Sequence, residues 1–280
     1  MRIFTRTTDM QTFIQNYKME NPNHKIGLVP TMGALHNGHL SLIKQSTESC
    51  ELTIVSIFVN PTQFGKNEDF NKYPRKEKAD INLCKSLNTI VFMPTIKEIY
   101  PYKDDMQIKL IAPQSLSNIL EGKARVGHFD GVIQVVLKLF NIISPHKAFF
   151  GKKDAQQLLI IKQMVEDLFL PIEIVESQII RNENGLALSS RNVYLGDNEI
   201  KEALKISKSL REASKLIING ETNSKTIKEV ATKVLNGLEI EYFEIVNKKL
   251  EKIEKIEKNN TIILVVAKIN GVRLLDNLWI

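Results

Sequence analysis

A stretch rich in glycine and histidine at residues 29–39, Val-Pro-Thr-Met-Gly-Ala-Leu-His-Asn-Gly-His, carries the clearest chemical signal in the chain. It follows an apolar run typical of a strand and leads into a helical pattern over residues 40–50. Gly33 and Gly38 permit close approach of the backbone to a ligand, and the start of the helix offers N–H groups and a positive dipole end to an anion. We therefore expect this loop to bind phosphate.

Two histidines in this stretch indicate which kind of phosphate chemistry the loop could support. The glycine spacing matches a Walker A loop, but His39 and Leu40 stand where that loop needs Lys and Ser or Thr, so a P-loop is rejected. One helical turn places His36 and His39 on the same face, where two imidazoles can donate to oxygens that gain charge in a phosphoryl or nucleotidyl transition state. Two alternatives stay open: a zinc site, which lacks a third ligand at a familiar spacing, and an ordinary strand-to-helix turn.

A second segment, residues 151–157, again lies between a predicted strand and a predicted helix. Lys152 and Lys153 place two cations beside a helix N-terminus, where an anionic ligand makes them favourable. Asp154 and Gln157 have the spacing of a capping box, so these two side chains could equally be structural.

A third segment, residues 188–192, is Leu-Ser-Ser-Arg-Asn. Arg191 can hold a phosphate with two hydrogen bonds, and Ser189 and Ser190 add hydroxyl donors. The flanking Gly185 and Gly196 would leave this segment free to close over a ligand.

Further polar candidates follow the second predicted strand and precede a later helix. Gln63, in the stretch Asn-Pro-Thr-Gln-Phe-Gly at residues 60–65, could orient a small polar substrate, although Asn60-Pro61 is also typical of a strand-ending turn. Arg125 and His128 could reach a ligand or tie their loop down, and for His128 the structural interpretation is preferred.

The elements that must position these residues divide the chain in two. Apolar runs at residues 25–30, 53–59, 89–93, 147–150 and 172–177 alternate with helical patterns at 74–87, 129–143 and 154–169, the first opened by an N1-type Pro74. This rhythm predicts a doubly wound α/β domain over residues 1–180. Helices at 197–219 and 224–238 and strands at 241–246, 261–269 and 272–278 predict a smaller α+β domain over residues 181–280, with 248–258 as a solvated helix face or connection.

The composition excludes several other classes of protein. With 43% apolar and 25% charged residues, the chain of 280 residues is expected to be globular and soluble, and no apolar run approaches the length of a membrane span. The first ten residues lack an apolar signal core, so we expect a cytoplasmic protein without membrane partners. Two cysteines cannot build a disulfide framework or a thiolate zinc site.

Five stretches together, residues 30–39, 59–64, 127–131, 150–157 and 185–192, closely resemble the pantothenate synthetase (pantoate–β-alanine ligase) family in order and spacing. The resemblance runs from the N-terminus to about residue 200; beyond it only the general character of a smaller C-terminal domain is similar. It implies a cytoplasmic, homodimeric enzyme with a Rossmann-like fold. ATP, Mg²⁺, pantoate and β-alanine would be its small-molecule partners, and the reaction would pass through pantoyl adenylate, releasing AMP and pyrophosphate.

The resemblance also implies roles for particular residues. His39, His36 and Lys153 would be catalytic, with His39 as proton donor, and Gln63 and Gln157 would hold pantoate, Gln63 beside the β-alanine site. Mg²⁺ would be carried on the ATP phosphates. The nucleotide would be contacted by Met32, Gly33, Ala34, Leu35, His36, Asn37, Gly38, His39, Gly151, Lys152, Lys153, Asp154, Ile180, Leu188, Ser189, Ser190 and Arg191.

Two departures from the family pattern and two other functions bear on this interpretation. Lys152 stands where many relatives have an acidic residue and Leu188 where methionine is common, which we expect to tune affinity. The resemblance also implies membership of the HIGH-type nucleotidyltransferase superfamily. Another adenylate-forming or nucleotidyl-transferring enzyme of that superfamily would share His36, His39 and the Ser-Ser-Arg segment but lack the Asn-Pro-Thr-Gln-Phe stretch. A nucleic-acid-binding module is suggested only by the net charge of +6, and the basic residues are interleaved with acids, so no nucleic-acid partner is expected.

Overall fold

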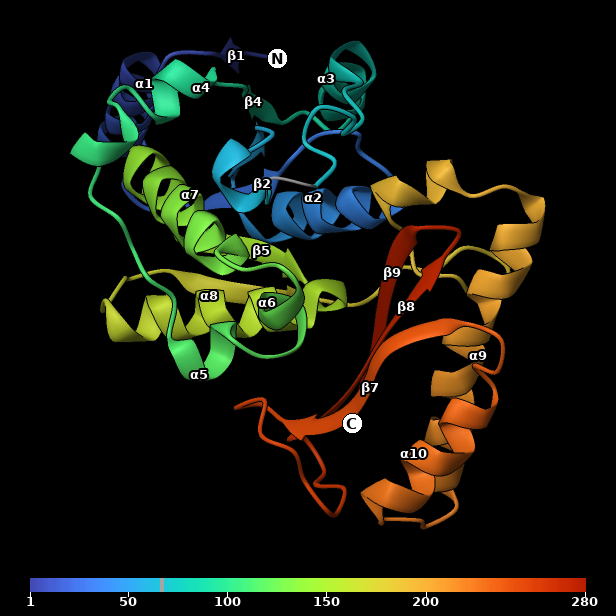
Figure 1. The fold of residues 1–280 in the computed structure, drawn as a ribbon. Coiled ribbons are helices and arrows are strands. Elements are labelled where there is room, and N and C mark those ends of the chain that lie inside the picture. Colours follow the sequence, from blue (N-terminus) through green and yellow to red (C-terminus); the bar gives the residue numbers. More distant parts are fainter. Residues whose placement is uncertain (66–67) are drawn as a thin grey trace. The chain divides into compact units, whose positions relative to one another are not determined.

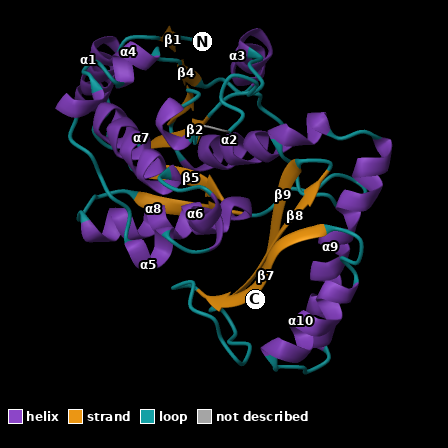
Figure 2. Cartoon of the chain, viewed as in Figure 1, coloured by secondary structure: helices purple, strands orange, loops and turns teal. Residues whose placement is uncertain are grey.

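The computed structural model describes residues 1–65 and 68–280 and contains two sheets (Figures 1 and 2). The larger sheet has six parallel strands in the order β1-β4-β3-β2-β5-β6, and the smaller has three antiparallel strands in the order β7-β8-β9. The larger sheet consists of β1 (Ile3–Phe4), β2 (Ile26–Thr31), β3 (Leu52–Ile57), β4 (Ile90–Phe92), β5 (Lys147–Gly151) and β6 (Glu173–Ser177).

Ten α-helices and four short 3₁₀ segments are found among the described residues. Those before β6 are α1 (Thr7–Glu20), α2 (Asn37–Ser49), α3 (Glu77–Ser86), α4 (Ile96–Ile99), α5 (Gln114–Ser117), α6 (Leu120–Ala124), α7 (His128–Ile143) and α8 (Ala155–Asp167). The 3₁₀ segments are η1 (Pro61–Gln63), η2 (Asp104–Met106), η3 (Lys152–Asp154) and η4 (Ser190–Tyr194). The C-terminal part holds α9 (Asp197–Ile218), α10 (Ser224–Lys233), β7 (Glu239–Asn247), β8 (Thr261–Ile269) and β9 (Val272–Trp279). Within these helices, none combines the length and apolar character that crossing a membrane requires.

The described chain forms two compact units. One contains residues 1–152 and 160–177, and the other contains residues 153–159 and 178–280. Lys153 and the first turn of α8 therefore group with the C-terminal residues rather than with β5, which directly precedes them in sequence. This grouping matters for the site, because Lys152 and Lys153 fall in different units.

The central strands of the first unit are buried on both faces, as expected for a parallel sheet between two layers of helices. All residues of β2 except Pro30 are buried, and the same holds for β3 except Leu52. α2 packs against β2, β3 and β5, whereas α1 and α7 lie together on the other side of the sheet (Figure 1). Gly27 allows the close approach of α2, because a Cβ there would overlap the Ser46 hydroxyl.

The order of the strands creates a switch point beside β2. The chain passes from β2 through α2 to β3 on one side, and later from β4 through α7 to β5 on the other. The loops that leave the carboxyl ends of β2 and β5 therefore diverge, and ligands of open α/β sheets bind at such a crevice. Residues 32–36 and residues 151–152, both expected to contact nucleotide, leave these two strand ends.

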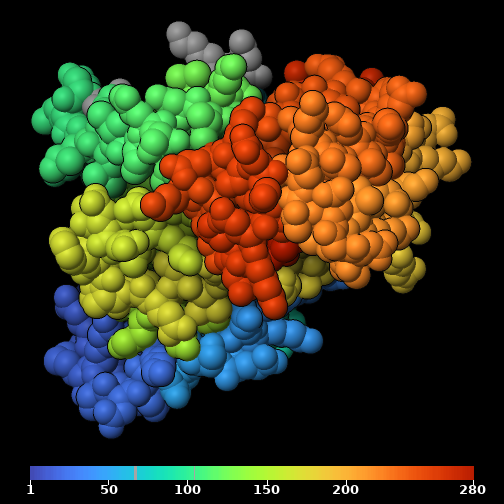
Figure 3. Space-filling model, turned by 90° about the horizontal axis from the view of Figure 1, so that it is seen from below, coloured from blue at the N-terminus to red at the C-terminus, as the bar shows by residue number. Residues whose placement is uncertain are grey.

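The second unit covers one face of its sheet with α9 and α10. Its core joins residues of these helices, among them Ile206, Leu210 and Ile227, to β-strand residues such as Phe243 and Val265. In the space-filling view, the orange helices and the redder strands and loops of this unit form a continuous surface (Figure 3).

Most expected elements are present, and three details differ. α3 begins at Glu77, so Pro74 is not its N1 residue, and α10 ends at Lys233 rather than near residue 238. The two-residue β1 was missed because so short a run has no measurable period. Residues 248–258 form a connection of turns and isolated bridges, which decides between the two interpretations of that charged stretch.

Candidate active site

A buried carboxylate shapes the loop after β2. Asp80 of α3 is 1% exposed, and its two oxygens accept the backbone N–H groups of Ala34 and Leu35, each at 2.8 Å. The loop needs this support because Gly33 and Ala34 both have positive φ, 81° and 51°. Burial raises the pKa of Asp80, an effect opposed by these two hydrogen bonds. Asp80 thus takes up two backbone N–H groups of the loop that precedes α2.

His36 and His39 form a capping box at the start of α2. His36 is the N-cap, and its Nδ1 accepts the N–H of Gly38 at 3.1 Å, while Nδ1 of His39 accepts the N–H of His36 at 3.3 Å. The ring centroids lie 4.1 Å apart. Because each Nδ1 is an acceptor, the proton of each neutral ring is on Nε2. The expected proximity of the two rings is confirmed, although His36 precedes the helix instead of lying within it.

The amide of Gln63 has a defined orientation. Its Oε1 accepts from Nδ2 of Asn60 at 3.1 Å, so its NH₂ group is directed the other way, toward the sulfur of Met32 at 3.1 Å. Asn60 is 1% exposed and is itself held by the hydroxyl of Tyr100, which donates to Asn60 Oδ1 at 2.8 Å. Two N-terminal site segments, the loop after β2 and the segment after β3, thus meet at the Met32–Gln63 contact.

α7 packs directly against the backbone of the segment that carries Gln63. A Cβ at Gly131 would overlap the carbonyl of Thr62 and lie 2.7 Å from the backbone nitrogen of Gln63. The Gly131 carbonyl also accepts from Asn60 Nδ2 at 3.0 Å. The glycine in the Gly-His-Phe-Asp-Gly stretch is therefore required for a close backbone approach beside Gln63.

His128 and Arg125 tie this region together. His128 Nδ1 lies 2.8 Å from the carbonyl of Gln63, and its Nε2 lies 3.0 Å from the Arg125 guanidinium. Arg125 also pairs with Glu68 at 2.6 Å. Burial, and then the charge of Arg125, lowers the pKa of His128 to about 4, so this ring is neutral at physiological pH. The geometry agrees with the structural interpretation preferred for His128.

The end of β5 brings two further predicted residues to the same edge of the sheet as the β2 loop. Gly151 is the last residue of β5, and Lys152 follows it with its ammonium 3.6 Å from a carboxylate oxygen of Glu176 on β6. Lys152 is thus engaged by an acidic residue of the neighbouring strand.

The second unit contains the remaining predicted residues. Lys153 and Asp154 complete η3, with the lysine ammonium 3.5 Å from the Asp154 carboxylate, and Gln157 is the third residue of α8. Ile180 and Leu188 are neighbours, because the Leu188 N–H donates to the Ile180 carbonyl at 3.0 Å across a hairpin.

That hairpin ends in the Ser-Ser-Arg segment. Ser189 caps η4 by accepting the N–H of Arg191 at 3.2 Å, and Ser190 and Arg191 form the first turn of η4. Gly185 lies in the hairpin turn with φ 93°, which glycine adopts without strain. Buried Leu186 and Leu195 on either side of the segment join the core of the second unit. Ser189 and Arg191 therefore project from a short, well-supported element.

Three supporting residues, Asp80, Asn60 and Tyr100, were not predicted to act on the site. Asp80 lies in a helix whose sequence pattern gives no sign of a distant loop, and Tyr100 follows a four-residue helix without a motif. Asn60 was noticed only as a turn residue. No cluster of three or more His, Cys, Asp or Glu side chains that could hold a metal occurs among residues 1–65 and 68–280.

The parallel sheet and the histidine-bearing loop at its switch point define a Rossmann-like α/β enzyme. A family model described as pantoate-beta-alanine ligase matches residues 2–279. The chain belongs to the pantoate-beta-alanine ligase family, and its activity is the ATP-dependent condensation of pantoate with β-alanine.

Individual relatives agree with this assignment. The chain is 54% identical to the pantothenate synthetase of Wolinella succinogenes over 281 residues, covering 100% of both chains, and 50% identical to that of Helicobacter acinonychis over the same coverage. The crystal structure of pantothenate synthetase from Thermus thermophilus matches with a TM-score of 0.92 and 33% identity, covering 100% of this chain and 99% of that one. The ligase of Francisella tularensis, solved with beta-gamma ATP and beta-alanine, matches with a TM-score of 0.81 and 36% identity, covering 100% and 97%.

Proposed function

We propose that the condensation runs in two steps through a pantoyl adenylate. The carboxylate of pantoate attacks the α-phosphorus of ATP and pyrophosphate leaves; the amine of β-alanine then attacks the acyl carbon, and AMP leaves with pantothenate as product. No protein nucleophile is needed, so the chain must position the reactants and stabilise charge on the phosphate oxygens. The observation that carries the proposal is the mutual capping of His36 and His39 at the switch point of the sheet.

The capping box prepares two hydrogen-bond donors. Because both Nδ1 atoms accept backbone N–H groups, each neutral imidazole presents its proton on Nε2. In our proposal these N–H groups donate hydrogen bonds to the phosphate oxygens that gain charge at the α-phosphorus, with the Nε2–H of His39 as the principal donor. Asp80 supports this role by holding the loop before His36 in one conformation.

We assign the contacts with nucleotide and pantoate to the residues predicted from the sequence, which lie in both units. Lys153, Ser189, Ser190 and Arg191 hold the triphosphate, and the C-terminal domain expected over residues 181–280 acts as a lid over ATP. The NH₂ group of Gln63, turned away from Asn60, donates to pantoate, and Gln157 contributes a second amide. The remaining nucleotide contacts are assigned to Met32, Gly33, Ala34, Leu35, Asn37, Gly38, Gly151, Lys152, Asp154, Ile180 and Leu188.

The proposed divalent cation would be carried on the phosphate oxygens of ATP. Among residues 1–65 and 68–280 there is no cluster of three or more His, Cys, Asp or Glu side chains that could hold it. We propose Mg²⁺, which keeps several waters and binds with few protein ligands. It would neutralise phosphate charge while the protein groups orient the reactants.

We also propose a cytoplasmic location and a homodimer, which the resemblance of the sequence motifs to this family implies. Sedimentation of the purified chain at micromolar concentration tests the dimer: a species of twice 31.9 kDa is expected, and a monomer would contradict it.

Pantoate-dependent exchange of labelled pyrophosphate into ATP, with β-alanine omitted, tests the two-step route. The adenylate step is reversible before β-alanine arrives, so exchange should appear with pantoate and Mg²⁺ and vanish without pantoate. Pantothenate formation by an enzyme that shows no such exchange, with pyrophosphate free to leave, would exclude the adenylate.

A further inference from the structure

Two adjacent polar residues near the end of β9 are buried. Asp276 is 3% exposed and Asn277 is 2% exposed. Burying a carboxylate and an amide costs free energy unless each finds partners, so their partners indicate what they do. Successive residues of a strand point to opposite faces, which lets the two side chains reach different segments of the second unit.

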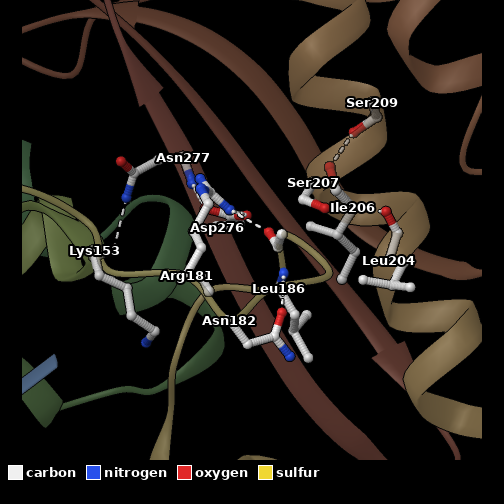
Figure 4. Close-up of polar contacts among 12 residues, drawn as sticks. Lys153, Arg181, Asn182, Leu186, Leu204, Ile206, Ser207, Ser209, Asp276 and Asn277 are labelled. Atoms are coloured by element: carbon white, nitrogen blue, oxygen red, sulfur yellow. Dashed lines mark hydrogen bonds and ion pairs between the residues drawn. The ribbon is translucent and has the colours of Figure 1, made fainter. Parts of the chain in front are cut away.

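Asp276 holds the hairpin that leads to the Ser-Ser-Arg segment. Its two oxygens accept from the Arg181 guanidinium at 2.5 and 2.8 Å, and Arg181 also donates to the carbonyl of Gly185 at 3.2 Å (Figure 4). Arg181 directly follows Ile180 and is bridged to Ala187 across the hairpin. The ion pair therefore fixes both arms of the hairpin against β9.

Asn277 holds the segment that carries Lys153. Its Nδ2 donates to the backbone carbonyl of Lys153 at 2.7 Å, while the lysine side chain extends away from this contact (Figure 4). A hydrogen bond to the main chain positions the segment without occupying the ammonium. Lys153 is thus linked to the same strand as the hairpin, one residue further along β9.

We propose that Asp276 and Asn277 are positioning residues for the adenylation step. They join the Lys153 segment and the hairpin before Ser189 into one arrangement, so that the ammonium and the Ser-Ser-Arg donors meet the triphosphate as a preformed set. Preformed donors lose no reorganisation energy when charge develops, and a displacement of about 1 Å can cost about a hundredfold in rate. This inference rests on the proposed roles of Lys153 and residues 189–191.

The test is single-turnover adenylate formation from ATP and pantoate by the full-length chain. Asn277→Ala removes the donor to Lys153 and should slow adenylation about tenfold or more with the KM for β-alanine unchanged. Lys268→Gln is the matched control, because it breaks the ion pairs of an exposed lysine with Glu239 and Glu241 in the same sheet, and its rate should equal that of the wild type. An Asn277→Ala rate within twofold of wild type in folded protein would overturn the proposal.

A double-mutant cycle separates positioning from general loss of structure. If Asn277 acts through Lys153, Asn277→Ala should cost little more once Lys153→Ala is present, whereas equal losses in both backgrounds would contradict the proposal. Should Asn277→Ala fail to fold, the isosteric Asp276→Asn takes its place, paired in a cycle with Arg181→Met under the same criteria.

Measurements on the wild-type protein separate a failure of the proposed adenylate route from a failure of the proposed positioning roles. Wild-type protein that forms no adenylate would refute the proposed route. A wild type that forms adenylate while the variants match it or combine additively would refute only the positioning roles of Asp276 and Asn277.

Discussion

The Nδ1 atom of His39 accepts the backbone N–H of His36, and the centroids of the two imidazole rings lie 4.1 Å apart at the start of α2. The same hydrogen bonds that begin the helix therefore also select the Nε2–H form of both rings. The two hydrogen bonds that cap α2 therefore also leave both Nε2–H groups as the hydrogen-bond donors of the rings.

Replacing His39 separates these two roles. His39→Ala should lower the rate of adenylation by about 10²–10³-fold, because a donor to the charged transition state is lost, with little change in the dissociation constant of pantoate. His39→Asn is the control for capping, since its side-chain oxygen can still accept the His36 N–H. Rapid-quench measurement of adenylate formation gives both rates. Near-normal turnover of His39→Ala would show that the ring has no role in the transition state.

The orientation of the Gln63 amide predicts how a negative charge at this position would affect pantoate binding. Gln63→Glu keeps an acceptor toward Asn60 but turns the NH₂ donor into a carboxylate oxygen, which would face anionic pantoate. We expect the KM for pantoate to rise about 10- to 100-fold while the KM for ATP stays within a few-fold. Gln134→Glu is the matched control, because the Gln134 side chain instead accepts the backbone N–H of Leu110 at 2.9 Å, a residue with no proposed role in the site. Equal pantoate KM values for the Gln63 variant and the wild type would place the substrate elsewhere.

The close contact at Gly131 predicts that a larger residue there would displace the backbone of Gln63. A methyl group there meets the backbone of Thr62 and Gln63, so Gly131→Ala should destabilise the fold by about 1–3 kcal/mol and raise the KM for pantoate. Urea unfolding and steady-state kinetics measure the two effects. Gly65→Ala serves as control, since among the described residues the atoms nearest to its Cβ are those of the Glu68 side chain, at an ordinary contact distance of 3.7 Å. Similar behaviour of the two variants would contradict the packing argument.

His128 makes stability depend on pH. The folded ring has a pKa of about 4 and the unfolded ring about 6.5, so the unfolded state binds the proton more tightly between these values. The contribution is fully present above pH 6.5 and is lost as the pH falls toward 4, by at most about 3 kcal/mol. His128→Gln should flatten this part of the dependence of unfolding free energy on pH. An unchanged slope would mean that the ring titrates normally in the folded protein.

The larger sheet could be predicted because its strands are local apolar runs whose period and flanking turns are visible in the sequence. The pairing of His36 with His39 was also predictable, since their spacing is local. The supports of the site were not: Asp80 lies 45 residues from Leu35 and Tyr100 lies 40 residues from Asn60. Such contacts depend on how helices pack against strand ends, which a local pattern does not encode.

The same limit applies in the C-terminal part. The Ser-Ser-Arg motif indicated a phosphate site, but nothing local linked Arg181 to Asp276, 95 residues away, or Lys153 to Asn277, 124 residues away. Both links arise from the antiparallel sheet, which brings β9 beside segments far apart in the chain.

An oxygen label in pantoate gives the most direct test of the pantoyl adenylate, because the oxygen that bridges the acyl carbon and the α-phosphorus in the adenylate ends as a terminal phosphate oxygen of AMP. Pantoate carrying ¹⁸O in its carboxylate should transfer one labelled oxygen to AMP during a full turnover with ATP and β-alanine, because that oxygen bonds to the α-phosphorus and leaves with it. We expect mass spectrometry to show singly labelled AMP and unlabelled pyrophosphate. Unlabelled AMP with the ¹⁸O in pyrophosphate would mean attack at the β-phosphorus, and ADP with the ¹⁸O in inorganic phosphate would mean attack at the γ-phosphorus; either result would exclude the pantoyl adenylate.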